Sequence, residues 1–212
     1  MTLTLSRAKE SDAPRIADIH MAAFGNNAML LAQFPTPAVR EGLWKSLVDK
    51  VIAEMRDSKW AILVVLNQKG EVISFAKWCL PVLESENYEE PPWRWPQGTK
   101  MAILDEWTEK VEAASEKILG TTPCYRLSFI GTDPLHQGQG AGALLVKWGL
   151  DRCEKENVPA ILEGTTNANP FYERFGFKSE ERILMQLDGV GQDGASMLYE
   201  ETCFVFRPNA VG

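Results

Sequence analysis

The segment Gln137-Gly-Gln-Gly-Ala-Gly142 decides the fold of this 212-residue chain. Before it, the apolar run at 125–132 predicts a strand; after it, the apolar spacing at 140–156 predicts a helix, followed by a short strand at 160–162. Strand, turn, helix and strand make a βαβ unit of ordinary length. Because glycines expose the backbone N–H groups at the start of the helix, the segment predicts a site for phosphate.

Three phosphate-binding patterns compete at this segment. A P-loop requires Gly-Lys-Ser/Thr, and here Gly140 is followed by Ala141 and Gly142, which excludes it. A dinucleotide fingerprint counted from Gly138 has Ala143 in its sixth place, an allowed variant. That fingerprint normally opens the first βαβ unit of a domain, however, and this segment lies about two-thirds along the chain. A dinucleotide-binding oxidoreductase is kept as an alternative of low rank.

The rest of the chain predicts one domain, 1–212, with strands and helices in a mixed order. Residues 81–100 are rich in proline, acid and tryptophan and show no helical or strand period, so we expect a loop excursion there. The remaining expected strands are 3–7, 60–66, 72–80, 178–187 and 197–206. Helices are expected from Ser11-Asp12, after Pro35-Thr36-Pro37, at 104–118 and at 169–174.

Composition excludes several classes of partner. The net charge is −7 and no cluster of Lys and Arg suits a phosphate backbone or an anionic membrane. No apolar run reaches the roughly 18 residues of a membrane span, and the start of the chain has no signal-peptide pattern. Four scattered cysteines and two histidines offer no spacing for a metal. We expect a cytoplasmic protein with reduced thiols, without metal, nucleic acid or membrane as partners.

Two motifs together resemble one known family. Gln137, Gly140 and Gly142 match the pyrophosphate loop Gln/Arg-x-x-Gly-x-Gly/Ala of the GNAT N-acetyltransferases. Further on, Leu162-Glu-Gly-Thr-Thr-Asn-Ala-Asn-Pro-Phe-Tyr-Glu-Arg-Phe-Gly-Phe177 resembles the family's second motif, a strand, a short helix with a tyrosine, and Gly-Phe. The resemblance covers about 125–177 and is to the members that acetylate small-molecule amines.

The resemblance implies an α/β (α+β) fold: a mixed, mostly antiparallel sheet of about seven strands, splayed between the fourth and fifth. It implies acetyl-CoA as cosubstrate, a primary amine of a small molecule as acceptor, and direct attack, with a homodimer as one option for assembly. Tyr172 would be the general acid for the CoA thiolate; packing beside Phe171 and Phe175 is its alternative role. The carrier would be held by Ile130, Gly131, Thr132, Gln137, Gly138, Gln139, Gly140, Ala141, Gly142, Ala143 and Asn169.

The general base is less clear from the residues. The glutamate usual in the family on the strand before the loop is absent from 125–132. Glu163 is the candidate base, acting through a water molecule, and an ion pair with Arg126 or Arg174 is the alternative. Asn169, ahead of Pro170, could equally cap a helix.

Each of the other notable residues could have either a functional or a purely structural role. Trp93-Arg-Trp95 could line a substrate site or an oligomer contact, or simply cover the core. His20 is expected in the acceptor cleft or the core, and His136 in a loop near phosphate. A non-catalytic acyl-CoA-binding module is the alternative to an enzyme.

Overall fold

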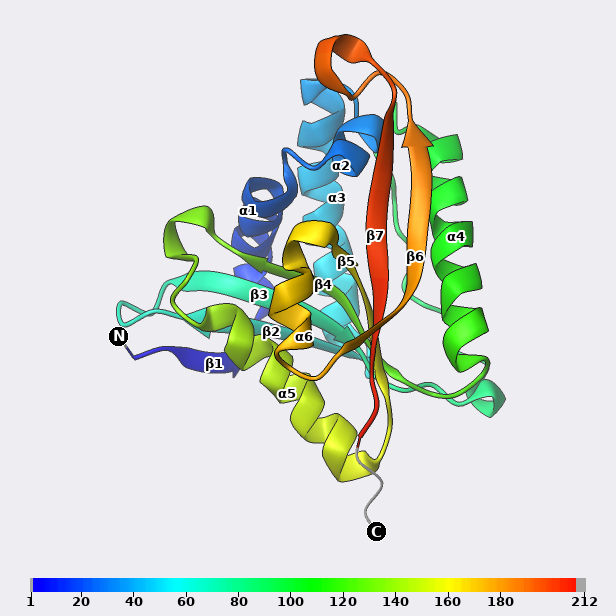
Figure 1. Cartoon of the computed structure of the whole chain (residues 1–212). Coiled ribbons are helices and arrows are strands. Elements are labelled where there is room, and N and C mark those ends of the chain that lie inside the picture. The colour runs from blue at the N-terminus through cyan, green and yellow to red at the C-terminus, as the bar shows by residue number, and fades with distance from the viewer. Residues whose placement is uncertain (1, 209–212) are drawn as a thin grey trace.

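The structure, a computed structural model, describes residues 2–208 and centres on a seven-stranded sheet in the order β1-β2-β3-β4-β5-β7-β6 (Figure 1). Neighbouring strands are antiparallel except β4 and β5, which are parallel. This confirms the expected mixed sheet. A dinucleotide-binding fold would instead have a mostly parallel sheet. The strands are β1 (Thr4–Arg7), β2 (Trp60–Leu66), β3 (Val72–Cys79), β4 (Tyr125–Thr132), β5 (Ala160–Thr165), β6 (Lys178–Leu187) and β7 (Met197–Phe206).

Helices cover both faces of the sheet. Ile62 and Val64 of β2 pack with α1 and α3, whereas Leu63 of the same strand packs with α5 on the opposite face. In the other half, Ile161 of β5 packs under α4 and Leu162 packs in the cluster of α5 and α6. The helices are α1 (Ala13–Phe24), α2 (Ala28–Gln33), α3 (Pro37–Arg56), α4 (Met101–Leu119), α5 (Ala141–Glu156) and α6 (Asn169–Glu173).

Local sequence explains where the helices begin. Thr36 caps α3 by accepting the N–H of Val39 at 3.3 Å, and Pro37 occupies the first turn, where no N–H is needed. Asn27 caps α2 in the same way. The sequence did not predict α2, because six residues span less than two helical turns and show no clear period. None of the helices within residues 2–208 is both long and apolar enough to cross a bilayer.

The close packing of α5 on the sheet depends on a glycine. The ring of Trp78 in β3 is fully buried, and a Cβ at Gly149 would stand 2.3 Å from it. The indole N–H of Trp78 donates to the carbonyl of Leu145 at 3.2 Å, one turn earlier in α5. Gly149 therefore lets α5 lie directly on Trp78, which fixes the helix whose N-terminus forms the glycine-rich turn.

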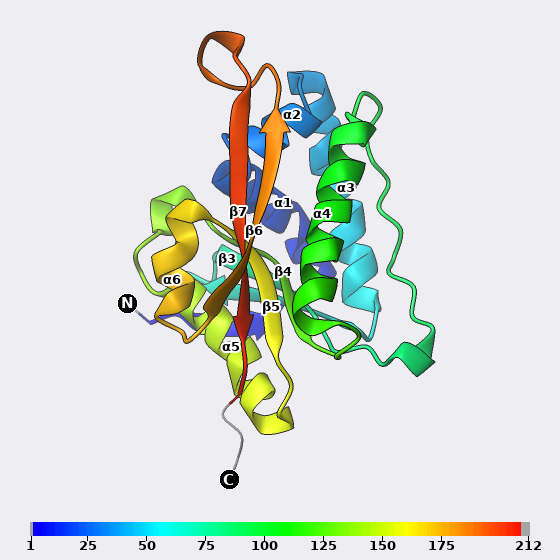
Figure 2. The same ribbon diagram turned by 45° about the vertical axis from the view of Figure 1, so that its right-hand side comes forward.

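The sheet opens between β4 and β5, as predicted (Figure 2). Only Tyr125 with Ala160 and Arg126 with Ile161 are paired between these strands. Beyond that point β4 stays paired with β3, through a register shift between Lys77 and Trp78, and β5 stays paired with β7. The later residues of β4 therefore present an unpaired backbone edge to the opening.

Most expected boundaries agree with the structure, and two differ by three residues. β5 continues to Thr165, three residues past the expected end at 162, because β7 pairs with it throughout. α4 begins at Met101 instead of 104, since Lys100 precedes it with a backbone bond to Gln33. Residues 81–100 contain only the short 3-10 turn Glu84–Glu86 and are otherwise irregular, as expected.

Candidate functional site

The glycine-rich turn presents free backbone donors to solvent. Gly138 and Gly140 have positive φ, +74° and +91°, and nothing lies within 4 Å of where a Cβ would stand at either. Leu144 is the first residue of α5 to bond back, its N–H donating to the Gly140 carbonyl at 3.3 Å. The N–H groups of residues 141–143 therefore have no hydrogen-bond acceptor within the helix. They lie at its positive end, an arrangement suited to binding a pyrophosphate.

The open edge of β4 supplies a second row of donors and acceptors. The N–H of Asp133 bonds to Ile73 in β3 at 2.9 Å, so alternation turns the backbone of Gly131 toward β3 and that of Ile130 and Thr132 toward the opening. Gly131 is needed for another reason: a Cβ there would stand 2.8 Å from the ring of Phe75. Ile130 and Thr132 are thus the β4 residues whose backbone can pair with an extended ligand.

The two sequence motifs meet in space. A Cβ on Gly142 would stand 3.2 Å from the ring of Phe171, so Gly142 lets the start of α5 approach α6. Nearby, the side-chain oxygen Oδ1 of Asn169 is buried and makes no hydrogen bond within the described residues. A buried acceptor without a donor is costly, and a ligand N–H beside it would remove that cost. Asn169 therefore fits the carrier-binding role expected from the sequence.

Tyr172 is buried against the sheet close to the opening. Its ring fits over Gly164 of β5, where a Cβ would stand only 2.8 Å away, and lies 5.7 Å from the ring of Phe204. Its hydroxyl makes no hydrogen bond to the other described residues. Burial, followed by the charges of Glu201 and Glu163, raises the pKa of the phenol, so it stays protonated at neutral pH. The position of Tyr172 is therefore compatible both with packing in the core and with donating a proton at the opening.

Glu163 forms the ion pair that the sequence analysis weighed as its alternative role. Its two carboxylate oxygens accept hydrogen bonds from Nη1 of Arg126 at 2.9 and 3.2 Å. The guanidinium also donates to Ser115 of α4 at 2.8 Å, so the pair is fixed on three elements. Burial raises the pKa of Glu163 and the charge of Arg126 opposes that shift. The base role of Glu163 stays a prediction.

A second carboxylate beside the opening was missed from the sequence. Glu201 of β7 is paired in register with Thr165, at the end of β5, and accepts a hydrogen bond from the hydroxyl of Tyr199. Asn27 donates to that hydroxyl at 2.9 Å. Burial is the main cause that raises the pKa of Glu201 to about 7. The alternation of 199, 201, 203 and 205 toward the core could have revealed it, since Glu201 falls on the apolar side of β7.

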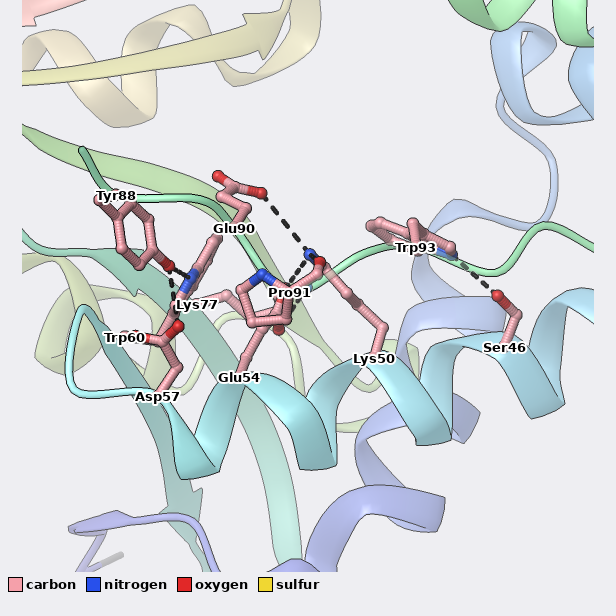
Figure 3. A network of polar contacts seen from close by, with 10 residues as sticks. All are labelled: Ser46, Lys50, Glu54, Asp57, Trp60, Lys77, Tyr88, Glu90, Pro91 and Trp93. Atoms are coloured by element: carbon pink, nitrogen blue, oxygen red, sulfur yellow. Dashed lines mark hydrogen bonds and ion pairs between the residues drawn. The ribbon is translucent and has the colours of Figure 1, made fainter.

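Segment 81–96 is fastened to α3 over a buried group of charges (Figure 3). Lys77 of β3 and Glu54 of α3 are almost fully buried, with Nζ 2.7 Å from Oε2. The contact is an ion pair without good hydrogen-bond alignment. Burial lowers the pKa of Lys77 and raises that of Glu54, and each charge opposes the shift of the other. Lys50 completes the group, 3.6 Å from Glu54 and 3.5 Å from the exposed Glu90.

The tryptophans of this segment cover the charges. Trp93 and Trp95 stack with ring centroids 4.3 Å apart, and the indole N–H of Trp93 donates to Ser46 of α3 at 2.8 Å. Nζ of Lys77 lies 5.1 Å from the Trp93 ring and 5.1 Å from that of Phe129 in β4. The aromatics therefore cover the core edge, the plain alternative considered from the sequence.

The two histidines are not placed for acid–base work at the opening. His20 is buried against Phe24, Phe75 and Phe129, and burial followed by the charge of Lys77 lowers its pKa to about 3. His136 lies in the 3-10 turn before the glycine-rich segment. Across residues 2–208, no three His, Cys, Asp or Glu side chains gather as they would around a metal ion.

Comparison with family models and with known proteins finds acetyltransferases and acyltransferases. Residues 97–186 match the family model described as Acetyltransferase (GNAT) domain. The probable acyltransferase SID5 of Ajellomyces capsulatus is 48% identical over 40 residues, which are 19% of this chain and 29% of that relative. The chain therefore aligns with less than a third of the relative's length.

Solved structures extend the likeness over the whole chain. An acetyltransferase of Corynebacterium glutamicum, described as histone acetyltransferase HPA2 and related acetyltransferase, is 22% identical with a TM-score of 0.63, covering 100% of this chain and 99% of its own. Polyamine N acetyltransferase of Drosophila melanogaster is 14% identical with a TM-score of 0.59, covering 97% and 100%. At these identities the likeness shows the fold. The family model spans both motifs, so residues 97–186 resemble a GNAT acetyltransferase domain, and the chain as a whole has the fold of the acetyltransferase structures.

Proposed function

We propose that this protein transfers an acetyl group from acetyl-CoA to a primary amine of a small molecule. One observation carries the proposal: the unpaired edge of β4 runs from the free N–H groups of α5 toward Tyr172 and the carboxylates Glu163 and Glu201. An extended ligand with a pyrophosphate at one end and a reactive thioester at the other suits that path.

The residues present fit such a carrier. The N–H groups of residues 141–143 would hold the pyrophosphate, and the backbone of Ile130 and Thr132 would pair with the extended arm. Oδ1 of Asn169 would accept an amide N–H. The carrier supplies the activated acyl group when bound; the protein supplies position and protons.

Tyr172 would protonate or hydrogen-bond the departing sulfur. A phenol, with an ordinary pKa of about 10, is protonated at neutral pH and can donate to a thiolate whose acid has a pKa of about 8.5. Burial raises the pKa of Tyr172 further, which keeps the proton on the oxygen until the sulfur becomes basic. An N–H at the open edge of β4 would stabilise the oxyanion.

The acceptor is proposed as a small amine for two reasons. The Drosophila melanogaster structure is described as that of an enzyme that forms N acetylagmatine. In this chain, the carboxylate of Glu201, which has no ion pair with a described Lys or Arg, lies on the same side of the sheet as the Glu163–Arg126 pair and would attract an ammonium group.

Calorimetric titration with acetyl-CoA, CoA, NAD and NADP tests the carrier. We expect selective binding of acetyl-CoA and CoA, followed by release of free thiol when agmatine or other primary amines are added. Binding of neither CoA species would remove the proposal.

A non-catalytic acyl-CoA-binding module remains the second candidate, because Arg126 already occupies both oxygens of Glu163. Tight acetyl-CoA binding without thiol release across a wide panel of amines would favour it.

A further inference from the structure

We infer that Glu201 takes the proton of the acceptor amine, and that Tyr199 and Asn27 are positioning residues that hold its carboxylate. This inference rests on the proposed acetyl transfer and names the residue that completes it. Alkylamines have a pKa near that of lysine, about 10.4, so most of the amine arrives protonated and must lose a proton before it attacks.

The position of Glu201 follows from the register of the sheet. β4 and β5 are last paired at Arg126 with Ile161, and β5 then continues beside the opening to Thr165, the partner of Glu201. Cys203, two residues on from Glu201, lies in the apolar cluster under α4. Glu201 therefore faces the same side of the sheet as Glu163, at the wide end of the opening.

The carboxylate is held by a chain of hydrogen bonds. Oδ1 of Asn27 accepts the N–H groups of Met29 and Leu30 at 2.8 and 3.3 Å, which fixes the amide as the cap of α2. Its Nδ2 donates to the Tyr199 hydroxyl at 2.9 Å, and that hydroxyl donates to Oε1 of Glu201. Oε2 of Glu201 makes no hydrogen bond to the other described residues, so this oxygen is available to an amine.

The charges around the two carboxylates separate their roles. Glu163 carries a cation, Arg126, bonded to both oxygens. Glu201 has no ion pair with any described Lys or Arg; its nearest groups on its own face are Tyr199 of its strand and Glu163 of β5, and its charge also acts on Tyr172, which packs over Gly164 on the opposite face. Burial and the charge of Glu163 raise its pKa, whereas the Tyr199 bond lowers it, and the result is about 7. A base with a pKa near the working pH is the most effective proton acceptor.

The step balances without another reactant. The ammonium loses one proton to Oε2 of Glu201, and the neutral amine forms a bond to the carbonyl carbon. The carbon–sulfur bond breaks, its electron pair stays on sulfur, and the sulfur receives the proton of Tyr172. The nitrogen, positively charged after the attack, loses its second proton to solvent and becomes a neutral amide. Glu201 then gives its proton to solvent and Tyr172 takes one back, so the net products are the amide, the free thiol and one proton.

The pH profile of Glu201→Gln tests the assignment, with Glu200→Gln as the matched control. Glu200 is the next residue, on the opposite face of β7, and pairs with the exposed Arg182. For the wild type we expect kcat/KM with the best amine of the panel to rise with pH through an inflection near 7. Glu201→Gln should lose that inflection and about 100-fold or more in kcat. Glu200→Gln should keep both.

Tyr199→Phe provides the readout for the positioning residues. Without the hydroxyl, the pKa of Glu201 rises, so the inflection should move to higher pH while the affinity for acetyl-CoA, measured by calorimetry, stays the same. Wild-type turnover with an unaltered Glu201→Gln profile would overturn this inference alone. Failure of the wild type to bind acetyl-CoA would instead overturn the proposed function.

Discussion

Arg126 and Glu163 are joined by an ion pair at the point where β4 and β5 separate. Arg126 is the last β4 residue paired with β5, and its guanidinium reaches forward to Glu163, two positions past its own partner Ile161. The side chains of Arg126 and Glu163 are 28% and 13% exposed, so most of the contact is shielded from water. The pair therefore fastens the narrow end of the opening on the α4 face.

Replacing Arg126 alone is expected to destabilise the fold. Arg126→Met would leave Glu163 buried without a cation, at a cost of about 3 kcal/mol in the free energy of unfolding. The pKa of Glu163 would rise further, so the loss should be larger at high pH and shrink as the pH falls and the buried carboxyl takes up a proton. Urea unfolding of Arg126→Met and of the double variant with Glu163→Met measures this. Equal losses in both variants would contradict it.

Gly140→Val should abolish acetyl-CoA binding. Gly140 has a φ of +91°, which L side chains rarely adopt, and a side chain would enter the space in front of the N–H groups of α5. Gly189→Val is the matched control, because Gly189 has a φ of +76° and open space around it but lies in the turn after β6. Calorimetry should find binding in the control and none in Gly140→Val; comparable binding in both would exclude the glycine-rich turn as the phosphate site.

Tyr172→Phe should lower kcat while leaving the affinity for acetyl-CoA unchanged. The hydroxyl makes no hydrogen bond within residues 2–208, so its removal is not expected to disturb the packing. Loss of a general acid typically costs about 100-fold or more in rate. Tyr125→Phe is the control: its hydroxyl bonds to Glu156 at 2.7 Å, and its loss should affect stability and not rate. A fall in affinity equal to the fall in kcat would argue against the acid role.

Lys77→Met should destabilise the protein by about 3 kcal/mol, because Glu54 is fully buried and would lose the cation 2.7 Å away. The pKa of Glu54, already raised by burial, would rise further. The loss should therefore be greater at pH 8 than at pH 5. Lys69→Met, in the exposed turn between β2 and β3, should change little. Thermal unfolding at the two pH values checks this, and a loss independent of pH would assign the effect to packing.

The order of strands and helices was predictable because the patterns are local. The strands β4, β6 and β7 begin and end at the predicted residues, since apolar alternation and turn residues define them. The glycine-rich turn was predictable for the same reason: spacing alone distinguishes the competing phosphate motifs.

The site was less predictable, because its charges come from residues distant in sequence. Glu163 pairs with Arg126, 37 positions away, and Asn27 reaches Tyr199, 172 positions away. Whether a glutamate on a strand is a free base or an ion-pair partner depends on what the opposite strand places beside it. Glu200 and Glu201 are adjacent residues of the same type, and only the face of β7 on which each side chain lies distinguishes them.

Because only two register pairs join β4 to β5, the backbone amides of the sheet fall into two separately hydrogen-bonded groups. β1 to β4 share one continuous ladder and β5 to β7 another. Free N–H groups of Ile130 and Thr132 should exchange with deuterium quickly, although they sit in the middle of a strand. Once an extended ligand occupies the opening, the same two amides should become slow, and the two halves of the protein should exchange as one cooperative unit.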